Sequence, residues 1–259
     1  MSIFVIGDLH GCYSEYQRLL REAGLTDVHG HWTAGDHQLW LIGDIFDRGE
    51  SGIECLELTM ALQNEARIHS GDVNALLGNH EMMILCAWRF RNALTSAGMR
   101  VIDQWRAWGG VLSDLGRLTE RHVAWLEALP AMVVLGDDTL LLHADAMFYV
   151  EHGRTPAEVN ESLHGVLRSE QLYRWENTLL SFSEHRAFSA AGTAGAHKAA
   201  QMARYFGVQR LVHGHTPIPL ARREPAYRAV EAWTYASGRC VNVDGGLYLG
   251  GPGFVHQLE

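Results

Sequence analysis

Three short apolar runs in the first third of the chain each stop at a glycine that is followed by an acidic or amide side chain. A run of this length without polar alternation is typical of a strand that is buried on both faces. Strands that alternate with polar loops and helices predict a parallel sheet covered by helices, which is an α/β fold. The runs and the residues after them are 3–6 with Gly7-Asp8, 39–42 with Gly43-Asp44, and 73–77 with Gly78-Asn79.

Helix-start signals and further apolar runs occupy the rest of the chain. Capping-box pairs, Ser14 with Gln17 and Ser51 with Glu54, predict helices that run to about residues 23 and 62. The sequence Thr155-Pro156-Ala157-Glu158 is a third predicted helix start. We see no repeat or linker, and we expect residues 1–259 to form one domain. The other predicted elements are a mostly helical stretch at 82–129, a hairpin at 132–142 with its turn at 136–138, a helix at 196–206, and strands at 210–212 and 240–243.

The composition narrows the classes of partner. The chain has 21 Lys and Arg against 30 Asp and Glu, a formal charge of -9, which disfavours binding to nucleic acid through its phosphate backbone. An acidic chain can still act on phosphates when bound cations reverse the local field. The four cysteines form no CxxC pair, and no basic leader or apolar run of membrane-spanning length is present. These features predict a cytoplasmic protein without a membrane partner.

The polar residues behind the three runs should meet in space. Loops beyond the carboxyl ends of strands in an open α/β sheet form one site, so Asp8, His10, Asp44 and the pair Asn79-His80 should converge. Two cations about 3.5–4 Å apart can activate water and neutralise the oxygens of a phosphate ester. Asp8 and His10 would serve the first cation, Asp44 would bridge, and Asn79 would reach the second. Two histidines at later strand ends are candidates to complete the set, namely His143 and His215.

These motifs resemble the calcineurin-like metallophosphoesterase superfamily, and most closely its phosphoprotein (serine/threonine) phosphatases with their bacterial and phage relatives. The resemblance implies a four-layer αββα sandwich with mixed sheets and the site at the strand carboxyl ends. It also implies the metal ligands Asp8, His10, Asp44, Asn79, His143 and His215. The segments that carry it are 7–11 (GDLHG), 43–49 (GDIFDRG), 78–81 (GNHE), Leu129-Pro130, 140–143 (LLLH), 214–217 (GHTP) and 243–246 (VDGG).

The resemblance also implies catalytic roles. His80 would protonate the leaving oxygen, Asp47 would orient His80, and Arg48 with Asn79 would hold the phosphate. An imidazole beside a carboxylate stays protonated more readily, and an Arg fork matches phosphate oxygens. The family has a second phosphate-binding arginine, for which Arg174 is our choice ahead of Arg168 and Arg186.

The sequence leaves the roles of two further residues undecided. Asp145 stands where the family usually has Gly, and it would either add charge near the second metal or cap residues 147–148. His213 precedes His215 in a His-x-His pair, and we interpret it as a strand residue because the Gly-His-x-His motif of phosphodiesterase branches is absent.

The function predicted is two-metal hydrolysis of phosphomonoesters, in phosphorylated proteins or small molecules. A carboxylate, amide and imidazole ligand set suits Mn, with Fe or Zn as alternatives. The enzyme alternative is a symmetrical dinucleoside tetraphosphate hydrolase, which shares the Gly7–Tyr13 opening but tends to lack the acid at Asp47 and to have Asp at the position of Glu81. A scaffold that has lost catalysis is a third reading, disfavoured because every expected ligand is present.

Overall fold

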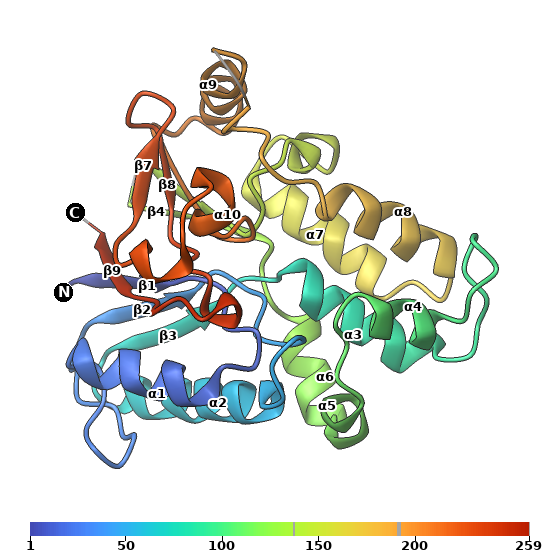
Figure 1. The fold of residues 1–259 in the computed structure, drawn as a ribbon, viewed down its shortest axis with the longest axis horizontal. Coiled ribbons are helices and arrows are strands. Elements are labelled where there is room, and N and C mark those ends of the chain that lie inside the picture. Colours follow the sequence, from blue (N-terminus) through green and yellow to red (C-terminus); the bar gives the residue numbers. More distant parts are fainter. Residues whose placement is uncertain (137, 191–192, 259) are drawn as a thin grey trace.

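The computed structural model describes residues 1–136, 138–190 and 193–258. The chain forms two mixed sheets (Figure 1). In the first, the order is β3-β2-β1-β9, with β1 to β3 parallel and β9 antiparallel to β1. In the second, the order is β4-β5-β6-β8-β7, with β5, β6 and β8 parallel. The strands are β1 Ile3–Ile6, β2 Gln38–Leu41, β3 Asp72–Ala75, β4 Met132–Leu135, β5 Thr139–Leu142, β6 Arg210–His213, β7 Trp233–Tyr235, β8 Cys240–Asn242 and β9 Val255–Leu258.

Successive side chains of the central strands enter two different cores. In β2, Leu39 and Leu41 join the core under the helices, whereas Trp40 joins a second core with residues of the other sheet. In β5, Leu141 points into that second core, between its neighbours Leu140 and Leu142 on the helix side. This period of two, with both faces apolar, is the reason why the runs lack polar alternation.

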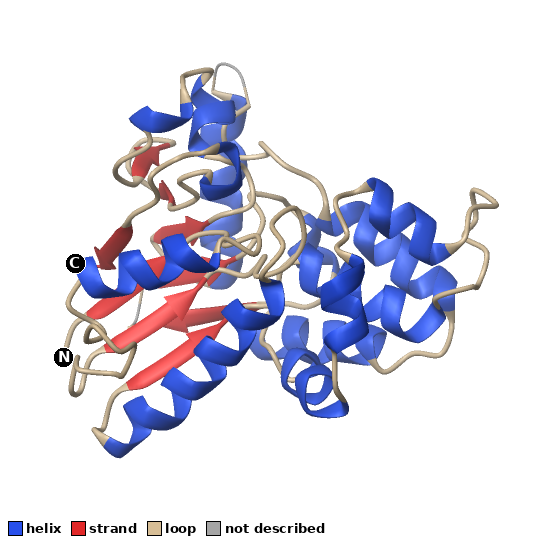
Figure 2. Cartoon of the chain, turned by 60° about the horizontal axis from the view of Figure 1, so that its bottom comes forward, coloured by secondary structure: helices blue, strands red, loops and turns tan. Residues whose placement is uncertain are grey.

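Helices cover the outer faces of the sheets and form an additional group at one side of the molecule (Figures 1 and 2). In Figure 1, α1 and α2 lie beneath β1 to β3, and the group of α3 to α8 lies to the right. The expected fold of two mixed sheets flanked by helices is therefore confirmed. The helices are α1 Tyr13–Glu22, α2 Gly52–Ile68, α3 Asn79–Phe90, α4 Val101–Ala107, α5 Leu112–Arg117, α6 Glu120–Glu127, α7 Pro156–Leu167, α8 Leu172–Phe182, α9 Ala194–Phe206 and α10 Ile218–Arg222, with 3₁₀ turns at Phe148–Glu151, Ala226–Arg228 and Leu247–Leu249.

The predicted helix starts have different outcomes. Thr155 accepts a hydrogen bond from the Glu158 amide at 3.2 Å, as expected. Neither capping box forms, because α1 already begins at Tyr13 and Ser51 makes no cap with its side chain. At α2 the cap comes from elsewhere in the chain. The hairpin is confirmed as β4 and β5, although Asp137 of its turn lies outside the described residues.

The carboxylate of Asp114, on α5, takes the place of a local cap for α2. It accepts hydrogen bonds from the amides of Gly52 at 3.1 Å and Ile53 at 3.4 Å. Gly52 is required there, since a Cβ would lie 2.6 Å from an Asp114 oxygen. The residue that satisfies these amides is 62 positions away, so no local motif could have indicated it. Helix α2 also extends beyond the predicted end at Leu62, to Ile68.

No helix in the described part of the chain combines the length and the hydropathy needed to cross a membrane.

We predict that Asp114 makes the stability of the chain depend on pH and that Asp114→Asn removes much of this dependence. Burial raises the pKa of Asp114 to about 6 from a usual value of 3.8, so the folded state favours the protonated acid. The contribution of this group to stability is present at low pH and is lost as pH rises from about 4 to 6. The unfolding temperature of the unmodified chain should therefore fall more between pH 4.5 and pH 7.5 than that of the Asn variant. The two pH-dependent differences are compared because the Asn NH2 group cannot accept one of the two amide hydrogen bonds, which lowers the stability of the variant at both pH values. An equal change in the two proteins would contradict this.

Candidate active site

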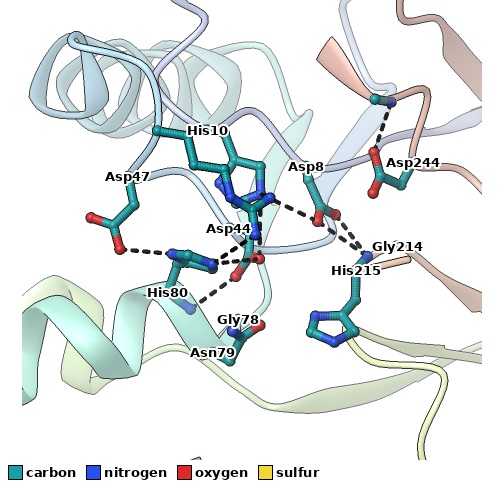
Figure 3. A network of polar contacts seen from close by, with 12 residues as sticks. Asp8, His10, Asp44, Asp47, Gly78, Asn79, His80, Gly214, His215 and Asp244 are labelled. Carbon is teal, nitrogen blue, oxygen red and sulfur yellow. Dashed lines mark hydrogen bonds and ion pairs between the residues drawn. The ribbon is translucent and has the colours of Figure 1, made fainter. Parts of the chain in front are cut away.

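The carboxyl ends of five strands from both sheets meet in one place, and the predicted metal ligands lie there. Figure 3 labels five of these ligands, Asp8, His10, Asp44, Asn79 and His215. Asp8 joins the two sheets, because its carboxylate accepts a hydrogen bond from the His215 amide at 3.0 Å. The His80 amide donates to Asp44 Oδ1 at 3.0 Å. The strand ends that the sequence predicted to converge therefore do so, and backbone amides that donate to the carboxylates hold them together.

Two groups of metal-binding side chains share Asp44. One consists of His10, Asp44 and His80, and the other of Asp44, His143 and His215. The Nε2 atom of His143 lies 3.2 Å from Asp44 Oδ1 and 2.9 Å from the side-chain oxygen of Asn79. Asp8 belongs to neither group, and its Oδ2 atom lies 3.9 Å from His10 Nε2. The arrangement is consistent with a binuclear metal site in which Asp44 faces both positions.

Backbone carbonyls set the orientation of two of these imidazoles. Nδ1 of His10 lies 2.9 Å from the carbonyl oxygen of Phe46, and Nδ1 of His143 lies 2.9 Å from that of Ile42. A carbonyl only accepts, so Nδ1 carries the proton in both rings. Nε2 of each ring then faces Asp44, in the position from which a metal-binding imidazole would bind an ion.

The charges of the buried ligands also favour bound cations. Burial and the neighbouring carboxylates of Asp244 and Asp44 raise the pKa of Asp8 well above its usual value. Burial and His143 lower the pKa of His215 to about 3, which leaves it neutral. Oδ2 of Asp244 is buried without a hydrogen-bond partner among the described residues. Divalent cations would neutralise these acids, so the residues present fit a pair of them.

His80 and Asp47 form a buried pair beside the shared carboxylate. Nδ1 of His80 lies 2.7 Å from Asp47 Oδ2, and both side chains are almost completely buried. Burial alone would lower the pKa of His80, but the carboxylates of Asp44 and Asp47 raise it above its usual value. The imidazole is thereby suited to donate a proton.

Backbone strain is concentrated at this site. A positive φ in a residue other than glycine costs on the order of 1–3 kcal/mol and persists only where surrounding contacts impose it. The cluster indicates that side-chain placement takes precedence over backbone preference at these positions. The residues and their φ angles are His10 at 44°, Asp44 at 52°, Asp47 at 69°, Arg48 at 72° and His215 at 66°.

Glu81 holds the ends of β2 and β3 together. Its carboxylate accepts hydrogen bonds from the amides of Asp44 and Ile45, both at 2.7 Å, and from the Gly78 amide at 2.9 Å. Gly78 permits the close approach, since a Cβ there would lie 2.3 Å from Asp44 Oδ1. In the sequence, Glu81 only distinguished the resemblance to phosphoprotein phosphatases from that to dinucleoside tetraphosphate hydrolases, which tend to have Asp at this position. The structure gives it a physical role.

A cavity of about 870 Å³ opens from these residues towards the helical group. Arg48, Asn79 and His80 line its inner end, and Val101, Trp105 and Leu179 belong to its apolar wall. The Arg48 guanidinium lies 2.6 Å from His10 Nε2 and packs 4.1 Å from the ring centre of Tyr248. Nothing in the sequence around Tyr248 signalled this contact.

The structure does not bring Arg174 to the cavity. On α8 the neighbouring Trp175 turns inward and Arg174 is exposed, and it is absent from the residues that line the cavity, whereas Arg186 is among them. Arg168, the other alternative, is also exposed and pairs with Glu161 at 2.7 Å.

Asp145 fixes the segment that carries Arg186. Its carboxylate accepts hydrogen bonds from the Arg186 amide at 2.9 Å and the Thr216 hydroxyl at 2.5 Å. It therefore joins two loops instead of capping residues 147–148. His213 lies in β6 with Nε2 2.6 Å from the Tyr235 hydroxyl, outside both metal-binding groups.

Comparison with known proteins agrees with this geometry. The model of the calcineurin-like phosphoesterase family matches residues 1–219. The chain belongs to the calcineurin-like phosphoesterases, and the histidines and aspartates of this site form two groups that could hold metal ions.

Named relatives divide into two kinds. A symmetrical bis(5'-nucleosyl)-tetraphosphatase of Nitrosococcus oceani is 30% identical over 132 residues, 51% of this chain and 39% of that protein. Shewanella-like protein phosphatase 2 of Arabidopsis thaliana is 32% identical over 106 residues, 41% of this chain and 27% of that protein. The matched segments thus span less than half of these relatives. A cold-active protein-tyrosine phosphatase of a Shewanella species has a similar fold, with a TM-score of 0.74 at 20% identity, over 100% of this chain and 75% of that one.

We predict that Glu81→Gln weakens metal binding and stability together. A glutamine amide group would face a backbone amide that now donates to Glu81, which leaves at least one buried donor without a partner at a cost of about 1–3 kcal/mol. Metal content after dialysis and the unfolding temperature should both fall. Glu127→Gln, which removes only a partly exposed pair with Arg89, is the control and should change neither. Unchanged metal content in the Glu81 variant would count against this role.

Proposed function

We propose that this protein is a two-metal phosphomonoesterase that acts on phosphorylated serine, threonine or tyrosine in proteins, or on small phosphomonoesters. The observation that carries the proposal is the His80–Asp47 pair, which lies beside Arg48 at the inner end of the cavity and next to the shared ligand Asp44. The cavity thus presents a proton donor, a phosphate-binding cation and the metal-binding groups to one ligand. We further propose Asp8, His10, Asp44, Asn79, His143 and His215 as the metal ligands.

Each site residue has its own role in the proposed hydrolysis of a phosphomonoester. Two bound divalent cations, Mn by preference, would neutralise phosphoryl oxygens and activate the attacking water. Arg48 and Asn79 hold the phosphoryl group in line for the attack. His80 donates the proton that the departing alcohol or phenol oxygen requires, and Asp47 holds the imidazole in place. The proton of His80 comes from Nε2, because Nδ1 is bound to Asp47.

Arg186 is our proposal for the second phosphate-binding arginine, in place of Arg174. It lines the same cavity as Arg48, and its backbone is held by the buried Asp145. One of its guanidinium nitrogens donates to the Leu220 carbonyl at 2.6 Å, which leaves the remaining donors for a phosphate.

The second candidate function is symmetrical hydrolysis of dinucleoside tetraphosphates, which the similarity to the Nitrosococcus oceani protein supports. Two features favour monoesters. Asp47, which that group tends to lack, is present and bound to His80. The cavity also has few cationic groups for a polyphosphate. Besides histidines, its charged lining residues are Arg48, Arg186 and the acid Glu176.

A direct comparison of substrates tests the proposal. With Mn, Fe or Zn added separately, we expect kcat/KM for a phosphoserine or phosphotyrosine peptide to exceed that for diadenosine tetraphosphate at least about tenfold, a difference of about 1.4 kcal/mol in transition-state binding. Released inorganic phosphate and released nucleotide are the two measurements. A preference for the dinucleotide would select the alternative function. No turnover, together with no bound metal, would select the scaffold.

Matched substitutions test whether Arg186 or Arg174 binds the phosphate. Arg186→Ala should raise KM for a phosphomonoester about tenfold through loss of a charge-assisted hydrogen bond, with a smaller effect on kcat. Arg174→Ala should leave both constants within about twofold, since its side chain is exposed outside the cavity. The reverse pattern, with KM raised only in the Arg174 variant, would return the role to Arg174.

A further inference from the structure

The buried side chain of Trp105 contacts the catalytic pair directly. Trp105 lies on α4 with 2% of its surface exposed, and its Nε1 is 3.1 and 3.0 Å from the two carboxylate oxygens of Asp47. Asp47 Oδ2 in turn accepts a hydrogen bond from His80 Nδ1. One carboxylate therefore joins an indole and an imidazole, and the indole ring also lines the cavity.

The segment after Trp105 holds the neighbour of Asp47 as well. The Arg48 amide donates to the Gly109 carbonyl at 2.8 Å. Gly110 packs flat on the indole, since a Cβ there would lie 2.2 Å from the ring. Asp47 and Arg48 both have positive φ, so they depend on outside contacts to stay in place. Trp105 of α4 supplies a contact to Asp47, and Gly109, two residues after the end of α4, supplies one to Arg48.

We propose that Trp105 is a positioning residue for proton donation by His80. A buried carboxylate held by one partner can turn about its Cβ–Cγ bond, whereas the indole N–H reaches both oxygens of Asp47 and fixes its plane. The fixed carboxylate then fixes the imidazole, whose Nε2 faces the inner end of the cavity. Without the indole N–H, Oδ1 of Asp47 has no other hydrogen-bond partner among the described residues, and a buried oxygen of that kind destabilises the present orientation.

This inference rests on the proposed role of His80 as the acid, and the leaving group provides a test. Phenol, with a pKa of about 10, leaves poorly unless it is protonated. Nitrophenolate leaves readily without a proton. A misplaced acid should therefore slow phenyl phosphate hydrolysis more than p-nitrophenyl phosphate hydrolysis. A purely structural role of Trp105 would slow both alike.

The first measurement is kcat of Trp105→Phe on both substrates, with Mn at saturation. Phe keeps a flat apolar ring and removes the indole N–H together with the five-membered ring that carries it. We expect kcat to fall about tenfold or more on phenyl phosphate and less than about twofold on p-nitrophenyl phosphate. Trp125→Phe is the matched control, because it removes an indole hydrogen bond to Gln63 at 3.1 Å, outside the cavity. It should leave the ratio of the two rates unchanged.

The ratio stays informative if the variant is partly unfolded, because loss of folded enzyme lowers both rates by the same factor. Gly110→Ala is a second variant that displaces the indole without changing it, and it should shift the ratio in the same direction. Equal losses on the two substrates in both variants would overturn the proposal.

A double-mutant cycle separates this inference from the proposed function. His80→Asn should show the same leaving-group discrimination, and adding Trp105→Phe to it should cause no further loss on phenyl phosphate. Additive losses would show that Trp105 acts independently of His80, and would overturn the proposal. If His80→Asn itself shows no discrimination, the proposed acid role fails and the role of Trp105 fails with it. If His80→Asn shows the leaving-group discrimination and Trp105→Phe does not, the acid role of His80 is supported and the positioning role of Trp105 is overturned.

Discussion

The site depends on the three backbone hydrogen bonds that the Glu81 carboxylate accepts. Two of the amides, those of Asp44 and Ile45, follow β2, and the third, that of Gly78, follows β3. A buried carboxylate in this place replaces the ordinary ladder bonds that the two strands lose where they separate. Asp44, whose oxygens face both metal-binding groups, is held in a left-handed conformation by this contact. Ligand geometry is therefore set by the backbone and not by flexible side chains alone.

The two sheets contribute in different ways. The residues after the strands of the first sheet supply Asp8, His10 and Asp44 on short loops and the Asn79-His80 pair in the first turn of α3, all in segments short enough for motifs to describe. The second sheet supplies His143 and His215, and the amide of His215 is tied to Asp8 across the interface. The helical group then adds Trp105 and the cavity wall. The metal-binding groups thus belong to the sheets, and the surroundings of a substrate belong largely to the helices. This division agrees with relatives that have similar sequence identity to this chain, 30% and 32%, and differ in the activity that their names describe.

Local signals predicted the elements that local interactions stabilise, and failed where a distant side chain takes over. The start of α7 follows Thr155 and Pro156 as expected. Helix α2 also starts after Ser51 as expected, but its first amides are bound by Asp114 and not by the Ser51 side chain. Arg174 shows a similar limit. Which face of a helix turns inward depends on what packs against it, and in α8 Trp175 takes the inward position while Arg174 is exposed.

The sequence by itself determined the family and, through that resemblance, the two-sheet fold and the histidines of the second sheet. It also determined which residues of the first sheet meet, because they directly follow buried strands whose carboxyl ends share an edge. Only the tertiary structure decided the rest. It joined Trp105 to Asp47 and Tyr248 to Arg48, and it placed Arg186 in the cavity on a loop held by Asp145. These contacts connect residues 41 to 200 positions apart, through loops and helix faces that carry no periodic pattern. Their partners are fixed by packing in three dimensions, which no short segment of sequence records.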